Sequence, residues 1–388
     1  MLKFKLAELF TGTGAFSLAF EHTKKVETIY ANDFCKNSEI IFNENFSIKL
    51  DCKNLNDINE NTIPKMDILT GGFPCQPFSI AGEQKGFDDE RSNVFWKILK
   101  IIKKHKPKVV ILENVKNLQS HNNGNTFETI TKEIDKLKYF YKFKILNTSV
   151  YTSIPQNRER IYIVCFINKE DCDKFEFPEE VNDKDKIELN KMMESTIADK
   201  YYYKPDMKIW NALELDVKTP ISKNVIYQYR RYYVRENKNN VCPTLTANMG
   251  TGGHNVPIIK DTKGIRKLIP RECFNLQGFP KTYKLPKLSD AALYKLAGNA
   301  VSLPIVEKLA QKIVNILENI NSNNIKEKEK EIIIEDKEIV IEDKEIKLKN
   351  KKNKKSIKEV IEVIEDKEIK VKEEVIETKP IKNKKKNI

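Results

Sequence analysis

The cysteine at position 75 is the residue of this chain that is best placed to act as a nucleophile. It lies in the tetrad Phe73-Pro74-Cys75-Gln76, which follows an apolar, strand-like run over Met66–Leu69 and two glycines. Pro74 and Pro77 stiffen the backbone around it, so the thiol is presented on a loop rather than packed in a core. Because an isolated cysteine usually serves as a small buried hydrophobe, this interpretation depends on the neighbouring groups.

An acid and an amide follow a second apolar run. The short β-branched run over Val109–Leu112 ends abruptly in Glu113 and Asn114. In open α/β sheets, reacting groups collect at the carboxyl ends of the strands. We therefore expect Cys75 and Glu113 to lie at the same edge of one sheet.

Two arginines accompany a third apolar run. Arg158 and Arg160 come directly before the run over Ile161–Phe166 and lie on one side of an extended chain. A guanidinium group offers a planar set of donors and keeps its charge at physiological pH. The sequence thus predicts a site that combines a thiol, an acid and guanidinium groups.

A glycine turn near the start of the chain predicts a site for an adenosine-containing ligand. The expected first strand, Phe4–Leu9, leads into Gly12 and Gly14, and a second expected strand ends at Asp33. Glycine permits close approach of the backbone to a ligand, and the acid can accept from both ribose hydroxyls. NAD would also suit this pattern, but Ser17 replaces the third glycine of a dinucleotide fingerprint and weakens that alternative.

Six motifs, in this order, resemble those of the cytosine-C5 DNA methyltransferases of the bacterial restriction-modification type. They extend from the first strand to about Leu317 and leave only the C-terminal tail outside the resemblance. The motifs are Glu8-Leu9-Phe10-Thr11-Gly12-Thr13-Gly14, Gly72-Phe73-Pro74-Cys75-Gln76-Pro77-Phe78-Ser79, Glu113-Asn114-Val115, Gln156-Asn157-Arg158-Glu159-Arg160, Arg271-Glu272-Cys273-Phe274-Asn275-Leu276-Gln277-Gly278-Phe279-Pro280 and Gly298-Asn299-Ala300-Val301. The family usually has Asp where Glu8 stands, a conservative change.

The resemblance implies an α/β fold: a doubly wound, Rossmann-like sheet of the S-adenosylmethionine-dependent methyltransferase type, a smaller target-recognition domain and a low-complexity C-terminal tail. We expect a catalytic and cofactor-binding domain over residues 1–177 and a target-recognition domain over 178–263. A return segment over 264–320 would complete the catalytic domain, with a turn over Gly298–Val301 and a final amphipathic helix over Leu303–Ile320. The charged tail, 321–388, repeats Ile-Glu-Asp-Lys-Glu-Ile, and its composition predicts disorder or marginal helix.

By resemblance, Cys75 adds to C6 of a cytosine that has been flipped out of the duplex, and C5 then accepts the methyl group. Glu113 would hold or donate a proton at N3, Arg160 would bind the carbonyl oxygen of the base, and Asn114 would support the local geometry. Arg158 has a structural alternative, an ion pair with Glu159 or another acid. The loop residues expected to assist are Gln76 and Ser79.

By resemblance, the cofactor is S-adenosylmethionine, released as S-adenosylhomocysteine. Phe10 would stack near adenine, Asp33 would bind the ribose and Asp51 would lie near the adenine amino group, although Asp51 could equally be an ordinary loop carboxylate. The other expected cofactor-binding residues are Gly12, Thr13, Gly14, Phe34, Cys52, Phe73, Pro74, Asn299, Ala300 and Val301.

Two segments of the central region carry the expected contacts with DNA. The run Tyr229–Arg235 interleaves aromatic residues with arginines, which can bind phosphates and guanine edges, although an amphipathic, solvated strand would look similar. A glycine-rich loop follows over residues 243–255. The residues proposed from these segments are Arg230, Arg231, Arg235, Thr246, Gly252 and Gly253.

Composition agrees with this interpretation. The net charge of +13 and pI near 9.1 favour a polyanionic partner, and we expect double-stranded DNA. The seven cysteines show no Cys-x-x-Cys pair, so we expect neither disulfides nor a metal site. We further expect a cytoplasmic monomer without a membrane anchor, and a cognate restriction endonuclease as a possible partner.

Two other functions remain open at this point. A tRNA cytosine-C5 methyltransferase would share the catalytic motifs, but the text from Tyr229 to Asn255 lacks the signature of that branch. A non-catalytic DNA-binding protein would have lost Cys75, Glu113 or the glycine turn, and all three are present. Incubation with duplex DNA and with tRNA separates these alternatives.

Overall fold

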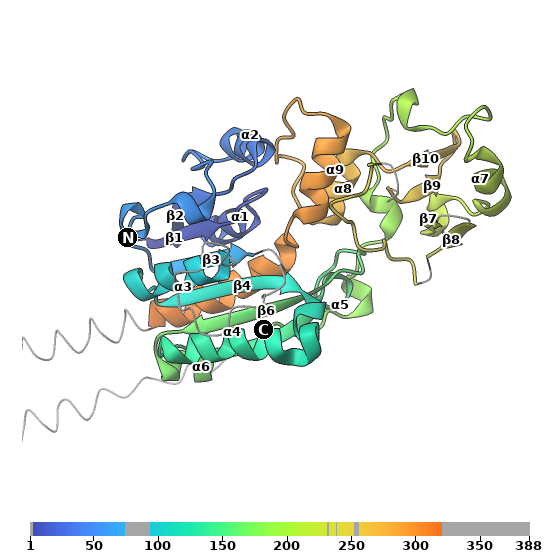
Figure 1. Cartoon of the computed structure of the whole chain (residues 1–388). Coiled ribbons are helices and arrows are strands. Elements are labelled where there is room, and N and C mark those ends of the chain that lie inside the picture. Colours follow the sequence, from blue (N-terminus) through green and yellow to red (C-terminus); the bar gives the residue numbers. More distant parts are fainter. Residues whose placement is uncertain (1–2, 74–93, 231–232, 238, 252–255, 320–388) are drawn as a thin grey trace, which may run out of the picture. The chain divides into compact units, whose positions relative to one another are not determined.

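A six-stranded sheet with the order β2-β1-β3-β4-β6-β5 carries the fold (Figure 1). Strands β2, β1, β3 and β4 run parallel, whereas β6 is antiparallel to both β4 and β5. The bounds are β1 (Phe4–Leu9), β2 (Val26–Asn32), β3 (Ile68–Gly72), β4 (Val109–Val115), β5 (Phe140–Asn147) and β6 (Glu159–Phe166). The α/β class predicted from the sequence is confirmed.

The computed structural model describes residues 3–73, 94–230, 233–237, 239–251 and 256–319. Residues Met1–Glu318 form one compact unit. The helices are α1 (Ala15–His22), α2 (Lys36–Asn45), α3 (Val94–His105), α4 (Asn125–Lys136), α5 (Thr148–Tyr151), α6 (Lys169–Lys174), α7 (Trp210–Asp216), α8 (Pro270–Leu276), α9 (Asp290–Asn299) and a final helical stretch over 303–319. The low-complexity tail, 321–388, lies outside the described residues.

Helix α3 packs its apolar side against the larger sheet. Phe95, Ile98, Leu99 and Ile102 recur at helical spacing, and all four are buried in one cluster with residues of β3 and β4. The opposite face carries lysines, and the basic last turn suits the negative end of the helix dipole. The apolar side of α3 therefore packs against β3 and β4, the strands that lead to the predicted site residues.

The strand order reverses at β1. The chain moves from β1 to β2 on one side and then to β3 on the other, so β2 and β3 flank β1. In doubly wound sheets, a crevice opens at such a switch point beyond the carboxyl ends of the strands. The glycine turn after β1 and Phe73, which follows β3, both lie at this point.

The β4–β6 pairing carries β4 past its apolar run, Val109–Leu112. The strand continues to Val115 because β6 pairs with it residue by residue: Glu113 faces Tyr162 and Val115 faces Arg160. Since β6 runs antiparallel, its first residues meet the last residues of β4. Glu113, near the end of β4, and Arg160, near the start of β6, therefore lie at the same edge of the sheet.

The central region forms a second, smaller sheet with the order β10-β9-β7-β8. Its strands are β7 (Tyr227–Arg230), β8 (Tyr233–Glu236), β9 (Ile258–Lys260) and β10 (Ile265–Lys267). The run Tyr229–Arg235, which would read as one strand, contributes to two antiparallel strands. This hairpin packs on its own cluster of buried side chains, Leu213, Val217, Tyr227, Val234, Ile258 and Ile265.

A buried ion-pair network links this sheet to α8. Arg266 in β10 donates to both carboxylate oxygens of Glu272, at 2.8 and 2.7 Å, and to Asp261 at 2.7 Å. Glu272 also accepts from the Ile269 backbone N–H at 2.8 Å. Because a buried charge is tolerated only when it is paired, the network fixes how the smaller sheet meets the return segment.

The return segment joins the start of the chain. The predicted final helix is confirmed over 303–319, and its inward positions, such as Leu309 and Ile313, are fully buried. Its outer side contacts the region after β1: Glu307 lies 2.8 Å from His22 Nδ1, and Glu318 pairs with Lys25. Gly298 and Asn299, expected in a turn, instead complete α9.

We predict that Gly298→Ala destabilises the protein by about 1–3 kcal/mol, because overpacking in a tight contact costs energy of this order. A Cβ at this position would lie 2.2 Å from the carbonyl carbon and oxygen of Thr246. Urea unfolding of the full chain measures the change. Gly71→Ala is the matched control, since its Cβ would meet no atom closer than 3.6 Å; equal losses in both variants would contradict the prediction.

Candidate active site

A cavity of about 620 Å³ opens at the carboxyl edge of the larger sheet, at the switch point beside β1. It brings together the turn after β1, the end of β2, the ends of β3 and β4, the start of β6 and the link after α9. The predicted site residues that line it are Phe10, Gly12, Thr13, Asp33, Phe34, Phe73, Glu113, Asn114, Arg158, Arg160, Asn299, Ala300 and Val301.

The glycine turn is joined to the end of β2 by hydrogen bonds. The Gly12 N–H donates to Asp33 Oδ2 at 2.8 Å, and the Cys35 N–H donates to Asp33 Oδ1 at 2.8 Å. Gly12 and Gly14 have φ values of 55° and 72°, in the left-handed region that favours glycine. A Cβ on Gly14 would also lie 2.5 Å from the Phe46 ring, so both glycines are required for this turn.

A buried carboxylate caps the helix that follows the turn. Glu8 in β1 accepts from the backbone N–H groups of Phe16 (3.3 Å) and Ser17 (2.9 Å) and from the Ser17 hydroxyl. These bonds satisfy donors at the start of α1 that have no partner within the helix. Burial, only partly offset by these bonds, raises the pKa of Glu8 to about 7. The Glu8 side chain, which is longer than the aspartate usual in the resembling family, therefore takes part in the hydrogen bonds of this turn.

The return segment also contacts the turn. The buried Tyr283 hydroxyl donates to the Thr13 carbonyl oxygen at 2.7 Å, and the Arg271 guanidinium donates to the Tyr283 carbonyl at 2.7 Å. A residue 270 positions away thus fixes one peptide of the turn. Arg271 is thereby connected to the glycine turn through Tyr283.

The acid and one arginine form a partly buried pair. Arg160 Nε lies 3.3 Å from Glu113 Oε1, and Arg160 also donates to the Glu159 carbonyl at 2.8 Å. Burial raises the pKa of Glu113, and the charges of Arg160 and then Arg158 oppose that shift. A carboxyl with a raised pKa holds a proton more readily near neutral pH, as a proton donor must.

Arg158 is fully enclosed and braces backbone instead of pairing with an acid. Its guanidinium donates to the carbonyl oxygens of Leu245 (3.0 Å), Gly298 (3.2 Å) and Ala300 (2.7 Å). The alternative of an ion pair with Glu159 is wrong, because Glu159 pairs with Lys116. Burial lowers the pKa of Arg158 to about 9, so the group stays protonated at neutral pH.

Asn114 connects the end of β4 to the last described residue before the predicted nucleophile. Its Nδ2 donates to the Phe73 carbonyl oxygen at 2.9 Å. Gly72, just before, is close to Glu113: a Cβ there would lie 3.3 Å from Glu113 Oε2. Pro74, Cys75, Gln76 and Ser79 lie outside the described residues.

Three expected cofactor residues lie apart from the cavity lining. The described residues that line it include neither Gly14 nor Asp51 nor Cys52. The Asp51 carboxylate accepts from the Tyr30 hydroxyl at 3.0 Å and lies 3.4 Å from Lys53 Nζ. Phe34, in contrast, lines the cavity while 74% of its surface is exposed, so its ring is available to a ligand.

The cavity also includes residues that sequence reasoning did not select. They come from the turn after β1, the ends of β2, β3 and β4, the region of α2, the start of α3, the segment after the Asn32–Asp51 bridge and α9. Asparagines are frequent throughout the chain, so no local pattern distinguished those in the cavity. The residues are Thr11, Asn32, Cys35, Asn37, Ser38, Asn54, Leu55, Asn56, Gly72, Val94, Val115, Ala292, Lys295, Leu296 and Gly298.

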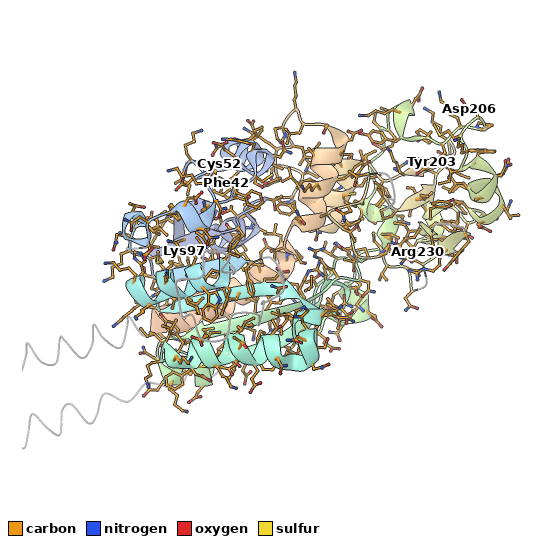
Figure 2. All side chains as sticks on the ribbon, viewed as in Figure 1. Phe42, Cys52, Lys97, Tyr203, Asp206 and Arg230 are labelled. Atoms are coloured by element: carbon orange, nitrogen blue, oxygen red, sulfur yellow. The ribbon has the colours of Figure 1, made fainter. Side chains whose placement is uncertain are left out.

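A second, larger groove of about 1400 Å³ lies at the smaller sheet. Of the expected DNA-binding residues, Arg230, Arg235 and Thr246 line it, and Figure 2 labels Arg230 on β7. Arg231, Gly252 and Gly253 lie outside the described residues. Neutral polar residues of the larger sheet's edge, Asn147 and Asn157, line the same groove.

The described residues show neither a group of metal-ligating side chains nor a membrane-spanning helix. Within the described ranges, no three His, Cys, Asp or Glu side chains are grouped so that they could hold a metal ion. No helix in the described part of the chain is long and apolar enough to cross a membrane.

Comparison with known proteins gives a consistent result. The family described as C-5 cytosine-specific DNA methylase matches residues 4–315. The Type II methyltransferase M.Bsp6I of Bacillus sp. (strain RFL6) is 46% identical over 315 residues, which cover 80% of this chain and 98% of that protein. M.HhaI of Haemophilus parahaemolyticus, also a Type II methyltransferase, is 37% identical over 324 residues, covering 80% and 94%.

Solved structures support the fold. The crystal structure of the S. pombe Dnmt2 methyltransferase aligns with a TM-score of 0.64 at 19% identity and covers 82% of this chain and 100% of that one. A putative DNA modification methyltransferase encoded within an E. coli prophage aligns with a TM-score of 0.61 at 16% identity, covering 81% and 100%. The Rossmann-like sheet predicted from the sequence is confirmed.

We predict that Glu8→Gln removes part of the pH dependence of stability. The folded pKa of Glu8, about 7, lies above its ordinary value of 4.5, so its contribution is fully present below pH 4.5 and is lost as the pH rises through 7. The loss is at most about 3 kcal/mol. Urea unfolding at several pH values measures it: the wild type should lose more stability than the variant between pH 4.5 and 7, and parallel curves would contradict the assignment.

Proposed function

The chain belongs to the C-5 cytosine-specific DNA methylases, and we propose that the cavity at the carboxyl edge of its larger sheet is where C5 of a cytosine from duplex DNA accepts the methyl group. One observation carries this proposal. A single cavity is lined both by the glycine turn, which suits an adenosine ligand, and by the Glu113–Arg160 pair, which suits a pyrimidine base. Donor and acceptor of the methyl group would therefore share one space.

S-adenosylmethionine is the proposed methyl donor, and it would supply an electrophilic methyl group on a sulfonium. The residues present fit it. The cavity lies within the usual range for small ligands, roughly 300–1,000 Å³. Gly12 permits close backbone approach, the Asp33 carboxylate lies at the end of β2 and the exposed Phe34 ring offers a stacking surface.

Cys75 is the proposed nucleophile, on the basis of its motif. C5 of cytosine is a weak nucleophile until the ring loses its aromatic stabilisation. Addition of the Cys75 thiolate to C6 breaks the C5–C6 double bond and places the electron pair on C5 and the N3–O2 system. After C5 has gained the methyl group, loss of the C5 proton to solvent and elimination of the thiolate restore the double bond and release the product.

The Glu113–Arg160 pair would handle the charge that develops on the base. The raised pKa of Glu113 favours the protonated carboxyl, which can donate to N3 as negative charge builds there. Arg160 would donate to the base oxygen while its Nε stays near Glu113. Asn114 would act indirectly, since it holds the Phe73 carbonyl two residues before Cys75.

The target cytosine has to leave the duplex, because no side chain reaches C6 within the stack. Extrusion of a base costs a few kcal/mol. The groove of about 1400 Å³ offers a surface for the duplex, and its lining includes Arg230, Arg235, Asn157 and Thr246. We propose that it holds the DNA while the base enters the smaller cavity.

The domain organisation follows the same proposal. Residues 1–177 and the return segment 264–320 would form the catalytic domain, and 178–263 the target-recognition domain. Because the named relatives are Type II methyltransferases, we propose that this protein protects host DNA in a restriction-modification system. It would act as a cytoplasmic monomer beside a cognate endonuclease.

Transfer of labelled methyl groups from S-adenosylmethionine tests the proposed function. We predict incorporation at C5 of cytosine in one short sequence of unmethylated duplex DNA, lost in Cys75→Ser because a hydroxyl is a far weaker nucleophile. Sequencing locates the modified cytosines. Transfer to tRNA in place of DNA would favour the tRNA methyltransferase, and an active Cys75→Ser variant would exclude the proposed nucleophile.

We predict that Glu113→Gln lowers the rate constant of methyl transfer about 10²- to 10⁴-fold, the usual contribution of a general acid. Because the acid must be protonated, the wild-type rate should fall as the pH rises through the raised pKa of Glu113, and the amide variant should lose this fall. Glu159→Gln is the matched control, since Glu159 pairs with Lys116 outside the cavity. Equal effects of both substitutions would contradict the role of Glu113.

A further inference from the structure

The β7–β8 hairpin has two faces of different character. Residues opposite each other on paired strands share a face. Tyr229 and its partner Val234 point toward the cluster of buried side chains under the smaller sheet. The other face carries the pairs Gln228–Arg235 and Arg230–Tyr233, and all four of these residues line the groove.

One amide oxygen holds two guanidinium groups on this outward face. Gln228 Oε1 accepts from Arg230 at 2.9 Å and from Arg235 at 3.0 Å. Since both donor nitrogens contact the same atom, their separation cannot exceed the sum of these two distances. The hairpin register alone would let two exposed arginines diverge, so Gln228 is what holds them together.

No acid of the described residues forms an ion pair with Arg230 or Arg235, whereas the buried Arg266 pairs with two carboxylates. Two like charges beside one neutral acceptor repel each other, so a ligand that supplies acceptors to both guanidinium groups is favoured. Arg235 has one further neutral contact, with Asn237 Oδ1 at 3.3 Å.

We propose that Arg230 and Arg235 determine sequence specificity by reading guanine in the major groove, and that Gln228 is their positioning residue. This inference rests on the proposed function, since it assumes duplex DNA in the groove. Guanine presents two acceptors, O6 and N7, in the major groove, and arginine donates to both in the commonest specific protein–DNA contact. A two-stranded ribbon such as β7–β8 fits that groove.

Base reading explains the geometry better than phosphate binding does. A phosphate contact also accepts a bidentate guanidinium, but a lysine serves it as a point charge, so it does not require two arginines that share one acceptor. Here a neutral amide restricts both guanidinium groups, and among the described residues the only further acceptor is Asn237 Oδ1, which contacts Arg235. Their closeness also suits neighbouring base pairs, which are stacked about 3.4 Å apart.

The experiment measures methylation by the full-length protein on a duplex library with randomised bases around a cytosine. The expected result is a requirement for at least one guanine other than the partner of the target cytosine. That guanine is then replaced by 7-deazaguanine, which lacks the N7 acceptor. Loss of N7 should slow the wild type about 10-fold or more, because a bidentate contact discriminates by this order.

Each arginine is then removed in turn. Arg230→Ala or Arg235→Ala should slow methylation of the preferred sequence about 10- to 100-fold, and 7-deazaguanine at the corresponding position should cause no further loss. Gln228→Met, which keeps the length but removes the acceptor, should reduce discrimination between guanine and 7-deazaguanine severalfold at unchanged Tm. Lys186→Ala, in the same groove, is the control: it should weaken all sequences equally.

The outcomes separate the two proposals. A wild type that methylates DNA without requiring such a guanine, or arginine variants that slow every sequence equally, would overturn guanine reading and leave the methyltransferase function intact. Equal slowing together with a weaker salt dependence would assign the arginines to phosphates. A wild type that methylates no member of the library would overturn the proposed function and this inference with it.

Discussion

A buried guanidinium determines how the parts of this protein come together. Burial of an unpartnered charge is costly, and Arg158 meets that cost with the carbonyl oxygens of Leu245, Gly298 and Ala300. These carbonyls belong to the glycine-rich loop, to the last turn of α9 and to the link after it, while Arg158 itself directly precedes β6. The two terminal nitrogens of Arg158 find these acceptors only when both distant segments have folded onto the sheet, so the site and its surroundings form together.

The dependence of the site on distant segments of the chain also explains which features could be predicted from the sequence. Local patterns identified β1, the glycine turn, the apolar core of β4 and the final helix, because each of these is specified within a few residues. The antiparallel entry of β6 could not be predicted, since an apolar run has no direction. The role of Arg158 could not be predicted either. Its partners are backbone carbonyls about 90 and 140 residues away, and every residue type carries a backbone carbonyl.

Close packing accounts for other corrections. Gly298 resembles a turn residue, yet it lies in α9, and its small size serves the contact with the Thr246 peptide. The run Tyr229–Arg235 alternates like one strand, but the smaller sheet uses it as two. In both cases the residue types fit a local conformation, and tertiary contacts select a different one.

Arg160 and the two arginines of the groove have opposite surroundings, and the difference matches the ligand proposed for each site. At the edge of the larger sheet, Arg160 lies beside an acid, which suits a neutral base that gains charge only during the reaction. In the groove, Arg230 and Arg235 share only neutral oxygens, which suits a ligand that brings its own acceptors. Because the inner face of the hairpin supplies its packing, the outer face can change its side chains without loss of the core. Specificity can therefore vary independently of the chemistry.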